Sequence, residues 1–225
     1  MIGILYIVAT PIGNLGDMTL RALETLKSVD VVLSEDTRVT GNLLRHFDIK
    51  KPLVSFHEHT ETEKAEKLIA RMQAGENMAL VTDAGTPGIS DPGNVLVALA
   101  AAAGIRVVPI PGASALGAIV SVAGIDMREF VFLGFPPHKK GRETFFKKVM
   151  ASDIPVIYYE SPHRVLKNLE LLMELAPDKN IILGRELTKI FEEVVRGSVS
   201  EVKTYLESKA GKMKGEFVIV VYPVT

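Results

Sequence analysis

Short apolar runs alternate with amphipathic segments along the first half of the chain. Leu20, Leu23 and Leu26 repeat at the spacing of one helix face, and residues 41–47, 60–74 and 94–103 are also expected to be helical. Thr60 and Glu63 form a capping box at the start of one of these helices. The apolar runs have the length of buried strands and lie at residues 4–9, 29–34, 53–56, 78–82 and 106–109. This alternation predicts an α/β fold that begins with a parallel sheet carrying helices on both faces.

The pattern changes in the second half. Helices are expected at residues 141–150 and 162–175 and after Ser198, which forms a capping box with Glu201. Strands are expected at residues 130–134, 155–160, 180–185, 192–196 and 216–222. Because some of these strands follow one another without a helix, antiparallel pairing and a mixed sheet are favoured. We place the hinge in the segment 109–117, which gives an N-terminal α/β domain at 1–112 and a C-terminal α/β domain at 113–225.

Three predicted strand exits are rich in glycine and proline. They are residues 8–17 (VATPIGNLGD), 83–93 (DAGTPGISDPG) and 111–115 (PGASA). One such loop would be explained by turn formation alone. Three of them at the carboxyl edge of a parallel sheet, where open α/β sheets bind ligands, indicate a binding site.

The composition of loop 83–93 limits the class of ligand that it could bind. It contains no Lys or Arg, so it does not match the phosphate-binding pattern GxxxxGK[ST]. Its ligand should rely on backbone contacts and tolerate nearby carboxylates, which suits the positive sulfonium of S-adenosylmethionine better than a nucleotide phosphate. Glu35, at the end of the second strand, keeps a nicotinamide dinucleotide open as an alternative, although the first loop lacks GxGxxG.

Composition limits the remaining functions. The chain has 225 residues, of which 47% are hydrophobic and 24% charged, with a formal net charge of −1 and no cysteine. Disulfides and thiolate zinc sites are excluded, and a reducing, cytoplasmic location is expected. The net charge argues against a surface that binds nucleic acid all over, although a local basic patch remains possible. No apolar stretch reaches the ~20 residues of a membrane span, and the first residues are expected to form a buried strand and not a signal peptide.

Seven ordered motifs carry a resemblance to a known family. They are residues 8–23 (VATPIGNLGDMTLRAL), 34–38 (SEDTR), 83–93, 111–115, 158–164 (YYESPHR), 184–189 (GRELTK) and 214–221 (KGEFVIVV). Across essentially the whole chain they resemble the ribosomal small-subunit RNA (cytidine-2′-O)-methyltransferases, a branch of the tetrapyrrole methylase superfamily. The resemblance implies a homodimer of two-domain subunits that hold S-adenosylmethionine between the domains. It also implies methyl transfer to a cytidine 2′-hydroxyl in 16S rRNA of the small ribosomal subunit. Many members continue past the last strand, so we expect any RNA contact made by that segment to be missing or replaced here.

The resemblance also assigns cofactor contacts, mostly through backbone atoms. The expected residues are Pro11, Thr86, Ile89, Ala115, Leu116, Tyr159, Glu186 and Phe217. Transfer from a sulfonium needs alignment above all, and a base would add about 10²–10⁴-fold. We take Asp83 and Glu186 as the catalytic candidates, with Glu35, Asp36 and His57 as alternatives. Each acid also has a structural interpretation: Glu35 and Asp36 could pair with Arg38, and Glu186 with Arg185 or Lys189.

For RNA, residues 136–148 (PPHKKGRETFFKK) combine cations with Phe145 and Phe146. Cations can follow phosphates and aromatic rings can stack on bases, but two core phenylalanines under a solvated basic face are the favoured interpretation of the rings. The predicted RNA contacts are Arg38, Lys139, Lys140 and Arg142, with Arg45 and Arg164 as further candidates.

Other interpretations of the sequence stay open. His57 and His59 have no third ligand nearby in sequence, so no metal is expected. A tetrapyrrole C-methyltransferase, which SEDTR, RELTK and the basic segment disfavour, and a non-enzymatic RNA-binding protein remain alternatives.

Overall fold

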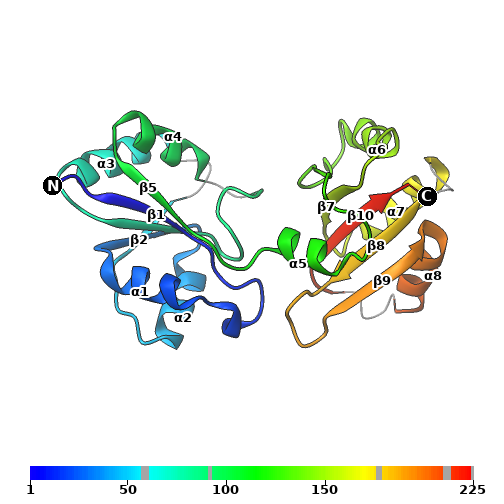
Figure 1. Ribbon diagram of the computed structural model, residues 1–225, viewed down its shortest axis with the longest axis horizontal. Coiled ribbons are helices and arrows are strands. Elements are labelled where there is room, and N and C mark those ends of the chain that lie inside the picture. Colours follow the sequence, from blue (N-terminus) through cyan, green and yellow to red (C-terminus); the bar gives the residue numbers. More distant parts are fainter. Residues whose placement is uncertain (57–60, 91–92, 176–178, 210–213, 224–225) are drawn as a thin grey trace. The chain divides into compact units, whose positions relative to one another are not determined.

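The computed structural model describes residues 1–56, 61–90, 93–175, 179–209 and 214–223. The chain divides into two compact units, Met1–Ser114 and Ala115–Thr225. Each unit has its own five-stranded sheet and its own hydrophobic core (Figure 1).

The first unit is built on a parallel sheet with the strand order β3-β2-β4-β1-β5. β1 (Ile4–Val8) lies between β4 (Met78–Val81) and β5 (Arg106–Ile110). β2 (Val31–Ser34) and the edge strand β3 (Leu53–Ser55) continue the sheet on the other side of β4. Because all neighbouring pairs are parallel, every strand of this sheet ends at the same edge.

Helices cover both faces of this sheet (Figure 1). α1 (Leu20–Ser28) and α2 (Thr37–His46) pack on one face, and α3 (Glu61–Gln73) and α4 (Asn94–Ala102) on the other. Side chains of β4 alternate between the two cores: Met78 and Leu80 face α3 and α4, whereas Ala79 and Val81 face α1 and α2. β2 and β4 are buried on both faces, which explains why the sequence shows them as unbroken apolar runs.

The second unit has a mixed sheet with the order β6-β7-β10-β8-β9. β6 (Val131–Phe132) pairs in parallel with β7 (Val156–Glu160). β10 (Phe217–Tyr222) runs antiparallel to both β7 and β8 (Asn180–Arg185), and β8 forms a hairpin with β9 (Glu193–Ser198). β10 therefore lies inside the sheet, between β7 and β8, and not at its edge.

Helices also lie on both faces of the second sheet. α6 (Arg142–Met150), α7 (Val165–Leu175) and α8 (Val199–Ser208) share one core with Phe217 and Ile219 of β10. α5 (Ala115–Val122) lies on the opposite face, where Ile119 packs near Gly184 and Val218. Arg196 of β9 donates to the carbonyl oxygens of Val122 and Ala123, which satisfies acceptors at the end of α5.

The predicted fold class is confirmed, and so is the capping box of Ser198 and Glu201. One prediction was wrong: Ala115 to Gly117 belong to α5, not to a connecting loop. α5 is apolar on almost every side, so its sequence shows no alternation of polar and apolar positions. The predicted capping box at Thr60 lies outside the described residues. Among the helices that the structure describes, none is long and apolar enough to cross a membrane.

Candidate functional site

The loops that follow β1 and β4 are joined by backbone hydrogen bonds at the carboxyl edge of the first sheet. The Thr10 N–H donates to the Gly85 carbonyl (2.9 Å), and the Gly85 N–H donates back to the Thr10 carbonyl (3.1 Å). The buried Thr10 hydroxyl also donates to the Thr82 carbonyl at 3.1 Å. These bonds hold residues 10 and 85 as a small antiparallel bridge beyond the parallel strands.

The loop after β5 also contacts the loops that follow β1 and β4. The Thr86 hydroxyl donates to the Ala113 carbonyl (3.1 Å). Gly112 lies against Ala9, because a Cβ at Gly112 would stand 3.0 Å from the Ala9 Cβ. The three glycine- and proline-rich exits therefore lie together within the first unit, and each of them contacts the other two.

Glycine is required where these loops meet. Gly85 and Gly88 have φ values of +84° and +86°, in the left-handed region that residues with a side chain rarely adopt. A Cβ at Gly85 would also lie 3.3 Å from Ile12 Cγ2. The loop thus presents bare backbone next to Pro11, Thr86 and Ile89, which are half-buried.

Asp83 ties this loop to the start of α2. Its Oδ1 accepts the N–H of Asp36 (3.0 Å), and Asp36 is the N-cap of α2. Hydrogen bonds from Arg38 lower the pKa of Asp36 to about 2, and the Arg38 guanidinium lies 2.6 Å from the Asp36 carboxylate. Asp83 itself is exposed, and within the described residues its Oδ2 makes no hydrogen bond. Arg38 has a local ion-pair partner, so its contact with RNA stays a prediction.

The charge of these loops suits a positively charged ligand. Residues 9–19, 82–93 and 111–114 contain three aspartates and no Lys, Arg or His. A cation placed near such loops is favoured, and a polyphosphate is not. The exposed backbone and the half-buried apolar side chains also fit a ligand with an uncharged ring system.

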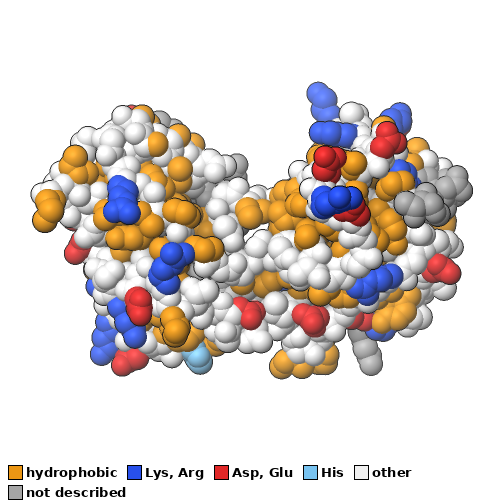
Figure 2. Space-filling model, in the orientation of Figure 1, with side chains coloured by type: hydrophobic (Ala, Val, Ile, Leu, Met, Phe, Trp, Pro, Cys, Tyr) orange, Lys and Arg blue, Asp and Glu red, His pale blue; other side chains and the backbone are white. Residues whose placement is uncertain are grey.

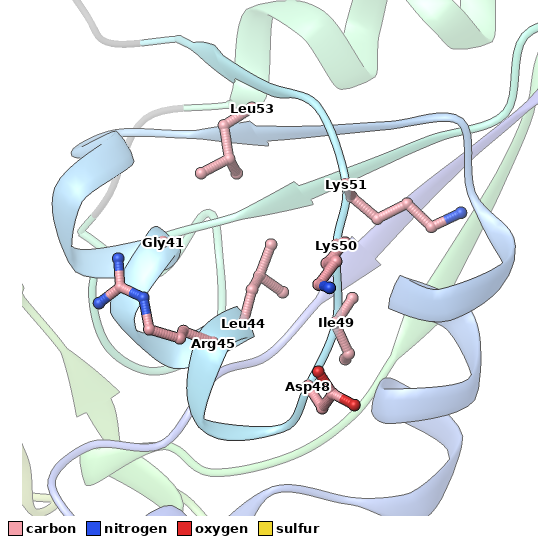
Figure 3. Close-up of a pocket in the computed structure, with 8 residues that line it drawn as sticks. All are labelled: Gly41, Leu44, Arg45, Asp48, Ile49, Lys50, Lys51 and Leu53. Carbon is pink, nitrogen blue, oxygen red and sulfur yellow. The ribbon is translucent and has the colours of Figure 1, made fainter.

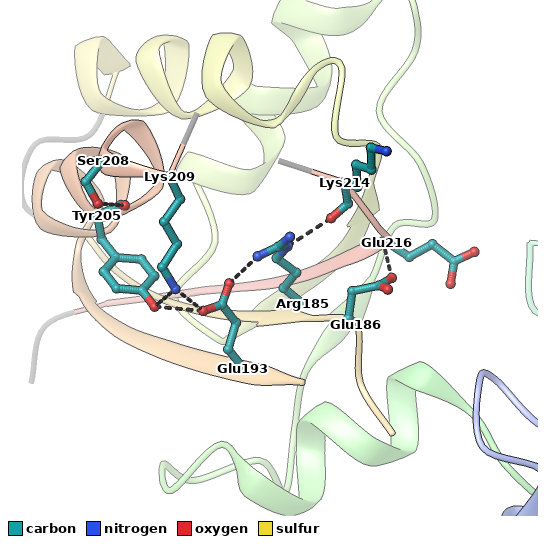
Figure 4. Close-up of polar contacts among 8 residues, drawn as sticks. All are labelled: Arg185, Glu186, Glu193, Tyr205, Ser208, Lys209, Lys214 and Glu216. Atoms are coloured by element: carbon teal, nitrogen blue, oxygen red, sulfur yellow. Dashed lines mark hydrogen bonds and ion pairs between the residues drawn. The ribbon is translucent and has the colours of Figure 1, made fainter. Parts of the chain in front are cut away.

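In the second unit, the motifs RELTK and KGEF interlock (Figure 4). The Glu186 carboxylate accepts the N–H of Glu216 (3.0 Å) and the ammonium of Lys189 (2.8 Å). In return, the Glu186 N–H donates to the Glu216 carbonyl at 3.0 Å. Gly215 is needed beside them, because a Cβ there would lie 2.4 Å from Glu186 Oε1.

This segment contains unusual backbone. Glu186 and Thr188 have φ values of +49° and +68°, which cost free energy for residues with a side chain. Burial raises the pKa of Glu186, but hydrogen bonds from Lys189 and Glu216 and the charge of Arg185 outweigh it, so the pKa lies below its ordinary value. Glu186 is therefore a firmly ionised acceptor and a weak proton base.

Glu193 holds the same segment from β9 (Figure 4). Its carboxylate accepts from Arg185 Nη1 (2.7 Å), Tyr205 Oη (2.7 Å) and Lys209 Nζ (2.6 Å). Arg185 Nε in turn donates to the Lys214 carbonyl at 2.9 Å. Burial raises the pKa of Glu193, but the bonds from Lys209, Arg185 and Tyr205 outweigh it and lower the pKa to about 2. Sequence reasoning missed Glu193, whose partners lie on β8, on α8 and at the C-cap of α8.

The other predicted cofactor residues of this unit differ in what they expose. Tyr159 is half-buried, and its ring centroid lies 4.9 Å from that of Phe132 and 5.4 Å from that of Phe135. Phe217 is only 2% exposed and its side chain lies in the core, so a ligand contact there would have to use backbone atoms. Ala115 and Leu116 are half-buried in the first turn of α5.

A buried charge network supports the basic segment. Glu160, on β7, is 1% exposed and accepts from Arg164 Nε (3.0 Å) and from Asn168. Arg164 Nη1 also donates to the Pro136 carbonyl (2.9 Å), at the start of the loop that carries Lys139 and Lys140. Arg164, a further RNA candidate, therefore has a positioning role. Glu160 ends β7 and Arg164 precedes α7, so their spacing of four residues is not that of neighbours on one helix face and gave no clear signal in the sequence.

The basic segment itself is exposed, and Figure 2 shows Lys and Arg side chains projecting around α6 and the loop before it. Lys139 and Lys140 are exposed, Arg142 is half-buried, and none of the three has a carboxylate partner among the described residues. Phe146 is fully buried and Phe145 packs on the same core beside Tyr158, so the core interpretation of the two rings holds.

His57, Glu58 and His59 lie outside the described residues. Among the side chains that the structure describes, no three His, Asp or Glu residues gather as a metal site would require.

Comparison with known proteins places the chain in a family. The model of the Tetrapyrrole (Corrin/Porphyrin) Methylases matches residues 4–203, so the chain belongs to this family. Its relatives include proteins named ribosomal RNA small subunit methyltransferase I. The one from Synechocystis sp. is 47% identical over 225 residues, covering 99% of this chain and 80% of that protein. Those from Neisseria meningitidis and Escherichia coli are 45% and 47% identical over 98% and 97% of this chain, which covers 76% and 77% of their length.

Solved structures show the same fold at lower identity. Cobalt precorrin-4 methyltransferase matches with a TM-score of 0.68 at 17% identity, covering 96% of this chain and 93% of that one. Uroporphyrin-III-C-methyltransferase from Thermus thermophilus matches with a TM-score of 0.65 at 22% identity, covering 98% and 94%. At this identity the likeness concerns architecture alone.

Proposed function

We propose that this protein transfers a methyl group from S-adenosylmethionine to the 2′-hydroxyl of a cytidine in 16S rRNA of the small ribosomal subunit. The observation that carries the proposal is the identity of 45–47%, over nearly the whole chain, to proteins named ribosomal RNA small subunit methyltransferase I. The alternative, methylation of a tetrapyrrole, is supported by the description of the family and by structures at 17–22% identity, but by none of these relatives at 45–47% identity.

The first unit supports the choice of cofactor. S-adenosylmethionine, when bound, supplies a methyl group on a positive sulfonium. Pro11, Thr86 and Ile89 would hold it, with the Thr10–Gly85 bridge and the Thr86–Ala113 bond fixing the loops around it. The predicted contacts of Ala115, Leu116, Tyr159, Glu186 and Phe217 are part of the same proposal.

The proton of the ribose hydroxyl needs an acceptor, and we assign Asp83 and Glu186 different parts. Glu186 is engaged by Lys189 and Glu216 and its pKa is lowered, so it suits positioning better than proton transfer. Asp83 is exposed and keeps one carboxylate oxygen without a hydrogen bond among the described residues, so it is the better base. Alignment of the hydroxyl with the methyl group would still supply most of the acceleration.

The exposed cations of the basic segment are proposed to bind RNA phosphates. Replacing Lys139, Lys140 and Arg142 by Glu should weaken RNA binding. It should also reduce the slope of log affinity against log salt concentration by about 0.7 for each phosphate of single-stranded RNA that is no longer neutralised. Affinity for S-adenosylmethionine should stay unchanged. A triple variant that methylates small subunits as well as the parent would place the RNA surface elsewhere.

Transfer of tritium from labelled S-adenosylmethionine tests the function directly. The protein is offered small ribosomal subunits, free 16S rRNA and a corrin precursor in parallel, and the labelled nucleoside is identified after digestion. We expect label only in RNA, as 2′-O-methylcytidine. Label in the corrin precursor alone would identify a tetrapyrrole methylase, and no label in any acceptor would favour a protein that binds RNA without catalysis.

A further inference from the structure

The first unit contains a pocket between α2 and β3 (Figure 3). Its volume is about 490 Å³, and we call it the α2–β3 pocket. Leu44 and Ile49 form an apolar floor and are 3% and 5% exposed. Leu53, at the start of the edge strand β3, closes one side and points towards α2 near Gly41. The size and the apolar floor fit a small organic ring system.

The rim of this pocket is mainly positive. Arg45 and Lys50 are exposed, and neither has a carboxylate partner among the described residues. Arg45 Nη1 donates to Asn42 (2.8 Å), which orients the guanidinium on the helix, and Lys51 Nζ donates to the Val29 carbonyl (2.6 Å). Asp48 is the single carboxylate in the lining. Lys51 is thus turned to the backbone and away from the pocket (Figure 3), which leaves Arg45 and Lys50 as the cations available to a ligand. Two exposed cations and one carboxylate around an apolar floor suit an anion that carries a ring, which describes a nucleotide.

Gly41 gives an independent reason to regard the pocket as a binding site. It lies in the interior of α2, where glycine weakens a helix relative to alanine. Its φ is not positive, and a Cβ there would meet only Leu53 Cδ1, at an ordinary contact distance of 3.6 Å. Neither backbone conformation nor crowding therefore requires glycine. A longer side chain at position 41 would enter the pocket, so glycine keeps the pocket open.

We propose that the α2–β3 pocket binds one unpaired nucleotide of the RNA substrate. Its phosphate would contact Arg45 and Lys50, its base would lie on Leu44, and Asp48 would accept from a base amino group or a ribose hydroxyl. This inference rests on the proposed function and adds a second RNA contact to it. Asp36 is the N-cap of α2, and its N–H donates to Asp83 at the loops. Arg45 lies nine residues further on, about 14 Å along the helix, so the bound nucleotide would be a near neighbour of the methylated one.

Two kinds of variant distinguish binding inside the pocket from electrostatic attraction by its cations. Gly41→Leu fills the pocket without changing charge, so it should weaken binding of 16S rRNA at least tenfold and leave the salt dependence unchanged. The double variant Arg45→Ala and Lys50→Ala should weaken binding and also reduce the salt dependence. The matched control removes Lys64 on α3, which packs on the opposite face of the sheet, and Arg106 on β5, at the opposite edge of the sheet, and it should change neither RNA affinity nor its salt dependence.

The readouts are RNA affinity at several salt concentrations, methyl transfer to small subunits, and S-adenosylmethionine affinity with thermal unfolding as tests of folding. If Gly41→Leu has lost its fold, Gly41→Gln takes its place. If the folded variant with the filled pocket binds RNA with normal affinity, the proposal that the pocket binds RNA is overturned. If the unmutated protein methylates no RNA, the proposed function is overturned. Cytidine monophosphate tests whether the pocket binds a free nucleotide instead. If it binds saturably at micromolar concentration, and Gly41→Leu abolishes this binding without weakening RNA affinity, the pocket binds a free nucleotide. That result would overturn the proposal that it binds RNA.

Discussion

Replacing Glu193 by glutamine should destabilise the second unit more than any ordinary surface substitution. Glu193 is 17% exposed at its side chain, and its pKa falls from 4.5 to about 2 through its bonds with Lys209, Arg185 and Tyr205. At about 1.4 kcal/mol per pKa unit, this fall is worth about 3 kcal/mol. Glutamine keeps the volume and one acceptor oxygen, so we expect Glu193→Gln to cost about 2–3 kcal/mol near neutral pH.

The free-energy cost of Glu193→Gln should depend on pH. Because folding lowers this pKa, the carboxylate stabilises the folded state above pH 4.5, and this stability is lost as the pH falls from 4.5 towards about 2. The cost of Glu193→Gln should therefore shrink when unfolding is measured at about pH 5, 4 and 3. Glu207→Gln is the matched control, because Glu207 pairs with Lys203 on α8 at 2.6 Å but is 47% exposed. That control should cost less than about 1 kcal/mol at any pH.

Tyrosine fluorescence during urea unfolding is the appropriate assay. The chain has no tryptophan and five tyrosines, and four of these lie in the second unit: Tyr158, Tyr159, Tyr205 and Tyr222. The signal therefore reports mainly on the unit that contains Glu193. Equal costs for Glu193→Gln and Glu207→Gln, or a cost of Glu193→Gln that is the same at about pH 5 and about pH 3, would refute this role of Glu193.

Three further predictions concern the active protein. Gly85→Val should lower S-adenosylmethionine affinity at least tenfold in calorimetry, since φ is +84° and Ile12 is close, whereas Gly104→Val, with φ +71° and open space, controls for backbone strain alone. Asp83→Asn should lower the turnover of methyl transfer by about 10²-fold or more if Asp83 is the base, and Glu186→Gln should mainly weaken positioning; unchanged turnover in both variants would leave alignment alone as the catalytic device. Light scattering should give a dimer, and a mass of 24.5 kDa at all micromolar concentrations would exclude one.

The sheets could be predicted from the sequence because burial dictates their composition. β2 and β4 are covered on both faces, so nearly every position is apolar, and this pattern does not depend on distant residues. The strand order could not be predicted in the same way. Parallel strands of similar composition can be neighbours in several orders, and backbone pairing leaves little trace in side-chain types.

The site was predictable in its location but not in its connections. Glycines mark where left-handed backbone is needed, which is why loop 83–93 stood out. The Thr10–Gly85 bridge joins main-chain atoms, which any residue could supply. No sequence motif therefore predicts that these two residues are paired. The pairing of Asp36 with Arg38 was an alternative that the sequence offered, whereas the pairing of Arg164 with Glu160 was not foreseen; the RNA contacts of both arginines stay predictions.

The position of β1 has a consequence for the order in which the chain can fold. β1 ends at residue 8, but its two neighbours, β4 and β5, begin only at residues 78 and 106. Until residue 110 has left the ribosome, a nascent chain carries an apolar strand with an unpaired edge, which other chains or a chaperone can bind. Fragments that end before β5 should therefore aggregate or recruit chaperones, while fragments that end just after residue 114 should not.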